Sequence, residues 1–320
     1  MTPETLAQVV AEANLAPSTH NTQPTQWRLD GDGLILSLNP QRFLPVGDPT
    51  NRDARLSMGA ALYGTELALK SRGYTIRATE AADEVRLAFS SGEATPPERP
   101  ITRRTSYRAG FSAPTDAQTT ALNQLCHARD DAALTVDADT IEALARLNDA
   151  TSLTIMRDRA FRDELRHWMR LKPSHPGWSQ DGLSAEALAM SGIEALGAGI
   201  ALSNPVFTLL DKIGLTKTIT AEYGKTITST GIVAFHRPEG EDRLTSGRQF
   251  YDLWLAFTEA DLAAWPMAAL ADDPNANAEV CSILKIPENQ ILINVFRVGP
   301  HPGRAQPPKA RLSPDKLIRP

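Results

Sequence analysis

The chain has few cysteines, and their spacing excludes two kinds of site. Only Cys126 and Cys281 occur among 320 residues. The adjacent pair Cys126-His127 cannot form a zinc loop, and neither cysteine has another Cys or His at a metal-ligand spacing. We therefore expect no bound metal, and sparse cysteine usage favours a reducing cytoplasm.

The chain also lacks a long uninterrupted apolar run and a recognisable leader. The most apolar stretch, at about 187–210, contains Glu194, Asn204 and Pro205, so we expect no membrane span. The first ten residues, MTPETLAQVV, are typical of a capped helix, with Thr2 as cap and Pro3 at its first position. A signal peptide does not begin in this way.

An excess of positive charge is missing as well. Lys and Arg number 33 against 38 Asp and Glu, which gives a formal net charge of −5. Because binding to a nucleic acid or to an anionic membrane generally needs a dominant positive surface, this balance argues against both partners for the chain as a whole. The hydrophobic share of 42% is ample for one large core or two smaller ones.

Helices and strands are expected to alternate irregularly, without the regular βαβ rhythm of a doubly wound sheet. Apolar periodicity predicts a first helix that starts at Pro3 and ends before Pro17, further helices at 58–69, 140–148, 160–171, 185–202 and 246–264, and strands at 34–38, 85–89, 231–236 and 291–298. A Pro/Gly-rich linker is expected at 90–100, and a turn at 265–267. The class is therefore α+β or mixed α/β.

Positive charge is concentrated in two segments that are far apart in the sequence. The first, 99–108, holds four arginines and no acid; the second, 297–320, holds six cations against one acid, Asp315. Guanidinium groups bind phosphate in a bidentate way and Ser106 would add a hydroxyl donor, so the two segments suggest one shared anion site. A solvated basic face with a basic tail is the alternative. The cations are Arg99, Arg103, Arg104, Arg108, Arg297, Arg304, Lys309, Arg311, Lys316 and Arg319.

A short polar loop lies between Pro17 and Pro24, directly after the first helix. Its sequence, PSTHNTQP, offers hydroxyl, imidazole and amide groups that both donate and accept hydrogen bonds. Such a loop suits the edge of a planar heterocycle, although it could also be a simple polar turn. A contact from His20 to a ligand is possible, but a turn residue is the more common role for a lone loop histidine.

Taken together, these motifs resemble the nitroreductase superfamily, and more closely the Acg family, in which two nitroreductase-like halves are fused in one chain. The resemblance rests on 16–24 followed by Trp27, on 48–74, on RRTSYR at 103–108, and on Asp181-Gly182. It continues through the helix at 247–264 with Trp265-Pro266-Met267 and ends with PENQILINVFRVGP at 287–300. It covers nearly the whole chain.

The resemblance implies an α+β nitroreductase-like fold that binds FMN, with one half at 1–95 and the other at 96–320. The phosphate would be held by Arg104, Ser106 and Arg108, with Lys309 and Arg311 returning from the end of the chain. The flavin ring would meet Pro17, Ser18, Thr19, Asn21 and Gln23 from the other half, and the backbone N–H groups of Ala268 and Ala269 would face flavin N5. Because each half carries only one of the two motifs, one FMN per chain is expected.

The implied activity is transfer of hydride from NAD(P)H through the flavin to a nitroaromatic, a quinone or a similar acceptor. The cofactor carries this chemistry, so no catalytic side chain is expected. The alternative is a protein that stores or sequesters FMN, with a segment near 173–182 covering the ring. The resemblance also implies a monomer that mimics a dimer, or a homodimer of such chains.

Overall fold

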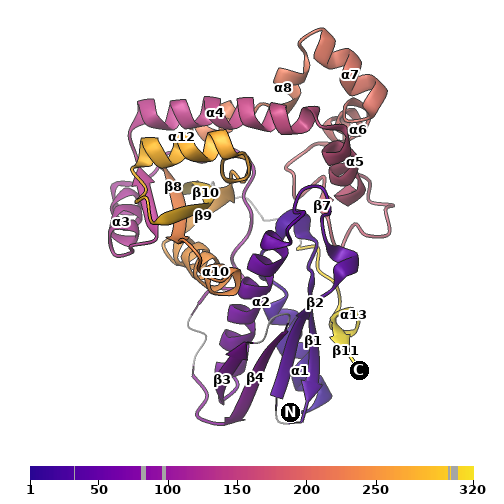
Figure 1. The fold of residues 1–320 in the computed structure, drawn as a ribbon, viewed down its shortest axis with the longest axis vertical. Coiled ribbons are helices and arrows are strands. Elements are labelled where there is room, and N and C mark those ends of the chain that lie inside the picture. The colour runs from indigo at the N-terminus through magenta and orange to yellow at the C-terminus, as the bar shows by residue number, and fades with distance from the viewer. Residues whose placement is uncertain (32, 81–83, 96–98, 302, 304–308) are drawn as a thin grey trace.

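The computed structural model describes residues 1–31, 33–80, 84–95, 99–301, 303 and 309–320, and it is an α+β protein (Figure 1). The helices are α1 (Pro3–Ala13), α2 (Arg52–Lys70), α3 (Asp116–His127), α4 (Ala138–Arg157), α5 (Arg159–Trp168), α6 (Gly192–Ala201), α7 (Asn204–Lys212), α8 (Thr216–Thr220), α9 (Tyr223–Thr226), α10 (Arg243–Glu259), α11 (Ala269–Asp272), α12 (Pro274–Leu284) and α13 (Pro314–Leu317). Single 3₁₀ turns occur at Thr19–Asn21 and Pro40–Arg42.

The strands form two larger sheets and one small one. The first sheet has the order β11-β1-β2-β4-β3, the second the order β5-β8-β10-β9, and β6 pairs with β7 in parallel. The strands are β1 (Thr25–Asp30), β2 (Gly33–Leu38), β3 (Tyr74–Glu80), β4 (Glu84–Ser91), β5 (Ala132–Thr135), β6 (Met169–Arg170), β7 (Leu183–Ser184), β8 (Gly231–Pro238), β9 (Leu262–Pro266), β10 (Gln290–Pro300) and β11 (Ile318–Arg319).

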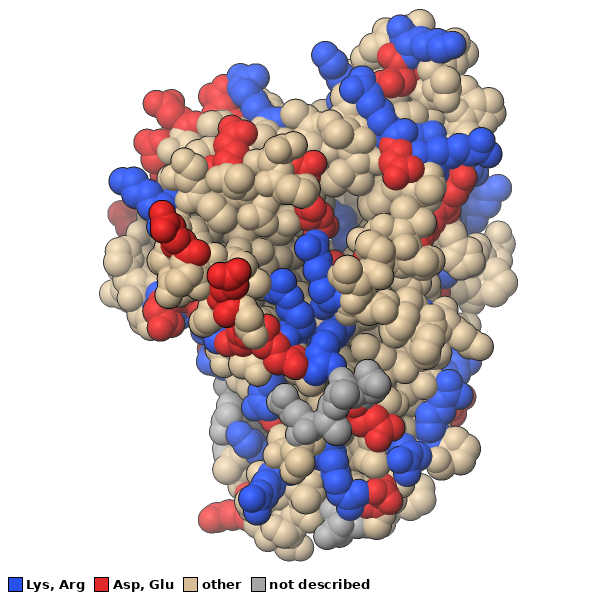
Figure 2. Space-filling view, viewed as in Figure 1, with Lys and Arg blue, Asp and Glu red and all other residues tan. Residues whose placement is uncertain are grey.

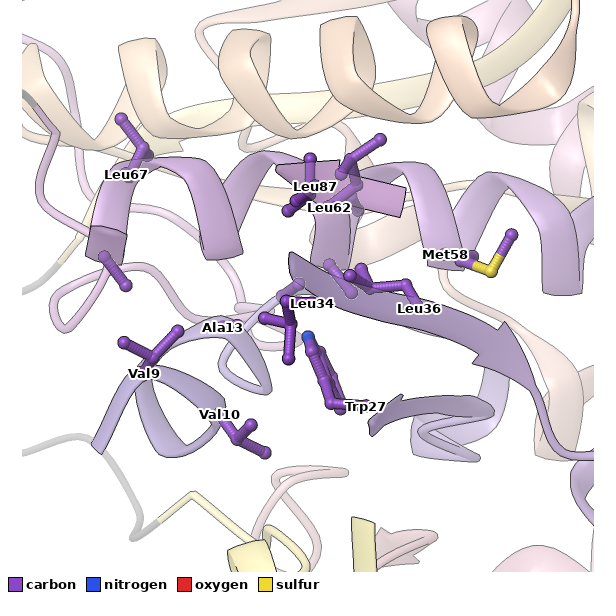
Figure 3. Packing of buried hydrophobic residues seen from close by; sticks show 14 of the residues in the cluster. Val9, Val10, Ala13, Trp27, Leu34, Leu36, Met58, Leu62, Leu67 and Leu87 are labelled. Carbon is purple, nitrogen blue, oxygen red and sulfur yellow. The ribbon is translucent and has the colours of Figure 1, made fainter. Parts of the chain in front are cut away.

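The first core lies between the first sheet and helices α1 and α2. Helix α1 begins where expected, because the Thr2 hydroxyl accepts the Thr5 N–H and Pro3 occupies the first turn. Figure 3 shows its buried side chains gathered with Trp27 and Leu34 of the sheet and with Leu62 of α2. The indole N–H of Trp27 donates to the Thr65 hydroxyl at 3.0 Å, which satisfies the buried donor.

Helix α10 contributes to the first core and also to a second core, which lies against the second sheet. Leu244, Tyr251 and Leu255 pack into the first core, whereas Phe250 and Trp254 pack with the second sheet. Helices α2 and α10 cross with their backbones in contact: a Cβ added at Gly59 would lie 2.2 Å from the Leu244 carbonyl oxygen. Only glycine permits this approach, and the close contact of α2 with α10 connects the first core with the second sheet.

The C-terminal segment returns to the first sheet. Strand β11 pairs in parallel with β1, with Trp27 opposite Ile318 and Arg28 opposite Arg319. Leu312 and Leu317 are buried in the first core, close to α1 (Figure 1). The last residues of the chain therefore complete a sheet built from its first hundred.

Several predicted elements are confirmed in type but wrong in extent. The helix predicted at 140–148 runs from Ala138 to Arg157, and the one predicted at 160–171 ends at Trp168, where β6 begins. The helix predicted at 185–202 begins only at Gly192, because Ser191 caps it and 185–190 form turns. The helix predicted to reach 264 ends at Glu259, and the expected turn at 265–267 is partly strand β9, which pairs with β10. Of the linker expected at 90–100, 90–91 belong to β4 and 96–98 lie outside the described residues.

In the part of the chain that the structure describes, no single helix is long and apolar enough to cross a membrane. Helices α6 and α7 together pass the same test of length and composition, but they are bent by 87° at the break between them.

Candidate functional site

The polar loop after α1 adopts an unusual backbone conformation. His20, Asn21 and Gln23 all have positive φ, at 50°, 56° and 52°. The Ser18 hydroxyl accepts the Gln23 N–H at 2.9 Å, and the Asn21 N–H donates to the Ser18 carbonyl at 2.9 Å, which holds the turn closed. Residues other than glycine adopt positive φ at a cost, and such positions cluster at functional sites.

The amides of this loop join segments from three parts of the sequence. Asn21 donates to the carbonyls of Gly182, at 3.2 Å, and Ala310, at 3.1 Å. Gln23 donates to the Gln180 carbonyl at 2.9 Å and accepts the Leu312 N–H at 2.9 Å. Loop 17–24, the segment 179–182 and the C-terminal segment therefore meet at one place.

Arg104 and Arg311 meet at this loop, although 206 positions separate them in the sequence. Each guanidinium donates to the Leu15 carbonyl oxygen at 3.1 Å, and Arg311 also donates to the Asn21 side-chain oxygen at 2.9 Å. The Arg104 guanidinium also lies 4.5 Å from the Trp254 ring centroid. The two positively charged segments expected from the sequence thus converge on the loop expected to meet the ring.

Two cations of this site, Arg104 and Arg311, have buried donor atoms without acceptors. Arg104 is only 3% exposed, and its Nε and Nη1 atoms, like Nε of Arg311, have no hydrogen-bond partner among the described residues. No carboxylate of the described chain forms an ion pair with Arg104, Arg108, Lys309 or Arg311. A buried, unpaired guanidinium is costly, so this cluster of four, the cation cluster, requires an anion to compensate it.

The pKa values of these cations reflect the same lack of a compensating negative charge. Burial, followed by repulsion from Arg104, lowers the pKa of Arg311 to about 9. Burial and the charges of Arg104 and Arg311 lower the pKa of Lys309 to about 7. The pKa of Arg108 falls to about 10, mainly through burial, although Glu222 acts in the opposite direction. Each shift would be relieved by a nearby negative charge. Figure 2 shows Lys and Arg side chains gathered in the hollow at the centre of the molecule.

Two further basic residues lie beside the cluster. Burial and the charge of Arg108 lower the pKa of His20 to about 4, so its imidazole is neutral at pH 7, and its ring lies edge-on to Phe161. Arg297 is fully buried but forms an ion pair with Glu222 at 3.2 Å and donates to the Arg108 carbonyl at 2.8 Å. Arg297 is therefore compensated within the chain, and the cluster is not.

The other predicted site residues lie as follows. Pro17 and Thr19 lie in the loop, and Ser106 forms a parallel bridge with Ala264 of β9. Ala268 and Ala269 lie at the start of α11, two and three residues beyond the end of β9, and their role toward a flavin stays a prediction. Arg99 and Arg103 form ion pairs with acids of the 252–261 region, Lys316 donates to Gln180, and Arg304 lies outside the described residues.

The structure adds residues that the sequence motifs did not single out. The Leu15 carbonyl accepts from Arg104 and from Arg311. The buried Asn14 side chain donates to Gln23 at 2.7 Å. Asp181 holds Arg42 at 3.2 Å and Arg170 at 2.8 Å, which fixes the segment that contacts the loop. The Asp181-Gly182 motif was a signal for this segment, whereas a backbone carbonyl leaves no signature in a sequence.

Metal ligation is not supported within the described ranges, where no group of three or more His, Cys, Asp or Glu side chains could hold an ion. Cys126 is buried and Cys281 partly buried, and both are free thiols. An anion bound by nitrogen donors is the chemistry for which the cluster is suited.

Comparison with known proteins gives a local sequence match. No family model matches the chain. Two proteins of Mycobacterium tuberculosis, from strains CDC 1551 and H37Rv and each named "Putative NAD(P)H nitroreductase", are 39% identical over 80 residues. The match covers 25% of this chain and 23% of each relative, so the chain spans about a quarter of the relatives' length in this alignment. Over this segment, the chain is similar to nitroreductases.

Solved structures of low similarity include two further nitroreductases. The FMN and NADPH-dependent nitroreductase NfnB from sphigopyxis sp. strain HMH is 15% identical, with a TM-score of 0.39 over 68% of this chain and 96% of that one. The FMN-dependent nitroreductase NfnB from Mycobacterium smegmatis, in complex with NADPH, is 17% identical, with a TM-score of 0.38 over 68% of this chain and 95% of that one.

Proposed function

We propose that the protein is an FMN-dependent oxidoreductase of the nitroreductase type, which accepts hydride from NAD(P)H and passes electrons to a nitroaromatic, a quinone or a similar acceptor. The observation that carries this proposal is the cation cluster, in which buried guanidinium donors of Arg104 and Arg311 have no acceptor. The local similarity to NAD(P)H nitroreductases supports the same conclusion.

The residues present fit the phosphate end of FMN. Arg104, Lys309 and Arg311 would supply charged donors to the phosphate, with Ser106 as a hydroxyl donor and Arg108 toward the ribityl chain or the pyrimidine edge. Bound FMN would supply the redox chemistry, since its ring accepts hydride and returns electrons. The chain positions and neutralises the cofactor rather than reacting itself.

The loop 17–24 would orient the flavin ring. Asn21 and Gln23 are held by Gly182, Ala310, Gln180 and Leu312, so neither amide has to be ordered when the ligand arrives. Preorganised polar groups increase affinity because their entropy has already been lost on folding. With its pKa near 4, His20 would present a neutral imidazole. The backbone of Ala268 and Ala269 completes the proposed contacts.

The proposal assigns 1–95 and 96–320 to two nitroreductase-like halves of the Acg-like arrangement, with one FMN per chain. Helix α10 packs into both cores and β11 pairs with β1, contacts that would correspond to those between the subunits of an ordinary dimer. The free cysteines Cys126 and Cys281 are compatible with the proposed cytoplasmic location.

The proposal is tested by mixing the purified protein with FMN and then, without oxygen, with NADPH or NADH. We expect one FMN to bind per chain, seen as quenching of flavin fluorescence, and the flavin absorbance to bleach at catalytic rates. Failure to bind FMN would refute the cofactor assignment. Firm FMN binding without bleaching by either nicotinamide would instead indicate storage of the cofactor and refute the reductase activity.

FMN affinity is expected to fall as the pH rises above 7. The pKa of Lys309 is lowered to about 7 from 10.5, so above pH 7 the flavin-free protein loses the proton that an anion requires, and FMN binding must take it up again. The Kd should rise by up to about tenfold per pH unit between about 7 and 8.5, below the pKa of Arg311. In the same window the unfolded chain binds more protons than the folded one, so the flavin-free protein should gain stability as the pH rises.

Flavin fluorescence titrations at successive pH values measure this dependence. Lys309→Arg is the matched variant, because a guanidinium in the same place keeps its proton to a higher pH than an amine does and should flatten the profile below about pH 8.5. A profile of unchanged steepness in that variant would assign the proton to another group.

A further inference from the structure

Helices α6, α7 and α8, with the turns between them, carry most of the exposed large apolar side chains of the described chain. Seven of the eleven such residues lie between 193 and 219. We call 192–220, which contains the three helices, the apolar arm. It projects at one end of the molecule, away from both chain termini (Figure 1).

The exposed side chains follow helical spacing. On α6, Ile193, Leu196 and Ile200 stand at i, i+3 and i+7, and Ile193 is 86% exposed. Leu209 and Ile213 stand four residues apart at the end of α7, and both are about 60% exposed. Side chains at these spacings share one helix face, so the exposed apolar side chains form a continuous face on each helix rather than isolated positions.

The arm is a folded platform with a buried side of its own. Leu202 and Phe207 pack with Leu153 of α4 in a small core. The Arg162 guanidinium donates to the Asn204 side chain at 2.8 Å and lies over the Phe207 ring. The exposed face is therefore held out to solvent by the packing of the opposite face.

The arm carries two acids, Glu194 and Asp211, and two lysines, Lys212 and Lys217, and of the two acids only Glu194 is exposed. Asp211 is paired with Arg157 at 3.0 Å and accepts the Thr216 hydroxyl, and Glu194 is engaged in the Ser191 capping box. Lys212 and Lys217 are exposed and form no ion pair with the rest of the described chain. In Figure 2 this end of the molecule is largely tan, with blue and some red side chains among the tan ones.

We propose that the apolar arm docks the protein onto a membrane surface that contains anionic lipid. The projecting aliphatic face, with Lys212 and Lys217 near it, fits helices that lie in a membrane interface. In such helices apolar side chains enter the boundary of the acyl chains and lysines contact the lipid headgroups. The 87° bend between α6 and α7 suits helices that lie in the interface rather than a span.

The overall charge of −5 does not prevent this contact. Charges separated by more than about 8 Å are largely screened at physiological salt, so the lysines beside the arm outweigh acids on the distant body. The inference concerns a surface outside the cation cluster and does not depend on FMN. Failure of either proposal would leave the other intact.

The test is cosedimentation of the full-length protein with vesicles of phosphatidylcholine, with and without phosphatidylglycerol. We expect binding that increases with phosphatidylglycerol and weakens with salt. Ile193→Glu together with Leu196→Glu should lower the partition coefficient by more than about tenfold, because two apolar anchors are lost. Lys212→Gln with Lys217→Gln should lower it by about fivefold per lysine on anionic vesicles only.

Val136→Glu is the matched control, since Val136 is exposed but lies outside the arm, and it should bind as the unaltered protein does. Equal sedimentation of the control and the Ile193/Leu196 variant, or no sedimentation of the unaltered protein with either vesicle, would overturn the proposal. A dimer in analytical ultracentrifugation that the Ile193/Leu196 variant dissociates, without vesicle binding, would assign the face to a second copy instead.

Discussion

Replacing Arg104 with methionine is expected to weaken FMN binding and, at the same time, to stabilise the flavin-free protein. The guanidinium is buried, has two unpaired nitrogen atoms and has its pKa lowered by burial, so without an anion it costs stability. Removing a charged hydrogen bond to the phosphate should cost about 1.5–3 kcal/mol of binding free energy. Methionine keeps the apolar packing on Trp254, and the free energy of unfolding should rise by about 1 kcal/mol or more.

These opposite signs separate a ligand-binding role from a structural one. Urea unfolding of the flavin-free protein measures its free energy of unfolding, and fluorescence titration with FMN measures the binding free energy. Arg103→Met is the control, because Arg103 is exposed and paired with Asp261, and both quantities should stay nearly unchanged. If Arg104→Met instead destabilised the flavin-free fold and left FMN affinity intact, the cation cluster would be structural.

Gly247→Val is expected to destabilise the whole protein strongly. A Cβ at Gly247 would lie 2.0 Å from the Leu56 carbonyl oxygen and 3.0 Å from the Gly59 Cα, so α2 and α10 would have to move apart. The helices also hold Arg55 to Asp242, Tyr63 to Asp252 and Glu66 to Arg248, and these contacts fix their relative positions. We expect a loss of about 3 kcal/mol or more, measured by thermal or urea unfolding.

A second helical glycine serves as the control for this substitution. A Cβ at Gly197 in α6 would meet nothing within 4 Å, so Gly197→Ala should be neutral or stabilising by up to about 1 kcal/mol. Similar stabilities for Gly247→Val and the unaltered protein would show that α2 and α10 can move apart with little loss in the free energy of unfolding. That result would contradict the view that α2 and α10 form a rigid joint between the two cores.

The strongly periodic elements could be predicted from sequence, and the locally ambiguous ones could not. The stripe Phe250, Leu253, Trp254 and Phe257 identified α10 because both of its apolar sides follow the helical period. The end of α10 was predicted too late in the sequence, since Leu262, Ala263 and Ala264 are apolar in either conformation and only pairing with β10 makes them a strand. Strand β11 has two residues and no pattern of its own, so its place depends entirely on β1.

The sequence singled out the residues of the candidate site by their motifs, but it did not indicate their geometry. Arg104 and Arg311 were singled out by charge, and the structure brings them to one carbonyl oxygen, that of Leu15. The positive φ of His20, Asn21 and Gln23 could not be inferred, because glycine would be the usual signal and none is present. The roles of these residues toward FMN stay predictions that the titrations above address.

The return of the C-terminus to β1 has a consequence for biosynthesis. Residues 310–319 follow the N-terminal sheet by more than two hundred positions, yet they cover the first core and supply three of the hydrogen-bonding partners of the loop 17–24, namely Ala310, Arg311 and Leu312. Because synthesis proceeds from the N-terminus, the sheet that begins with β1 gains its outer strand β11 only after residue 319 has been made. Until then the outer edge of β1 stays unpaired, and an unpaired strand edge can pair with another chain.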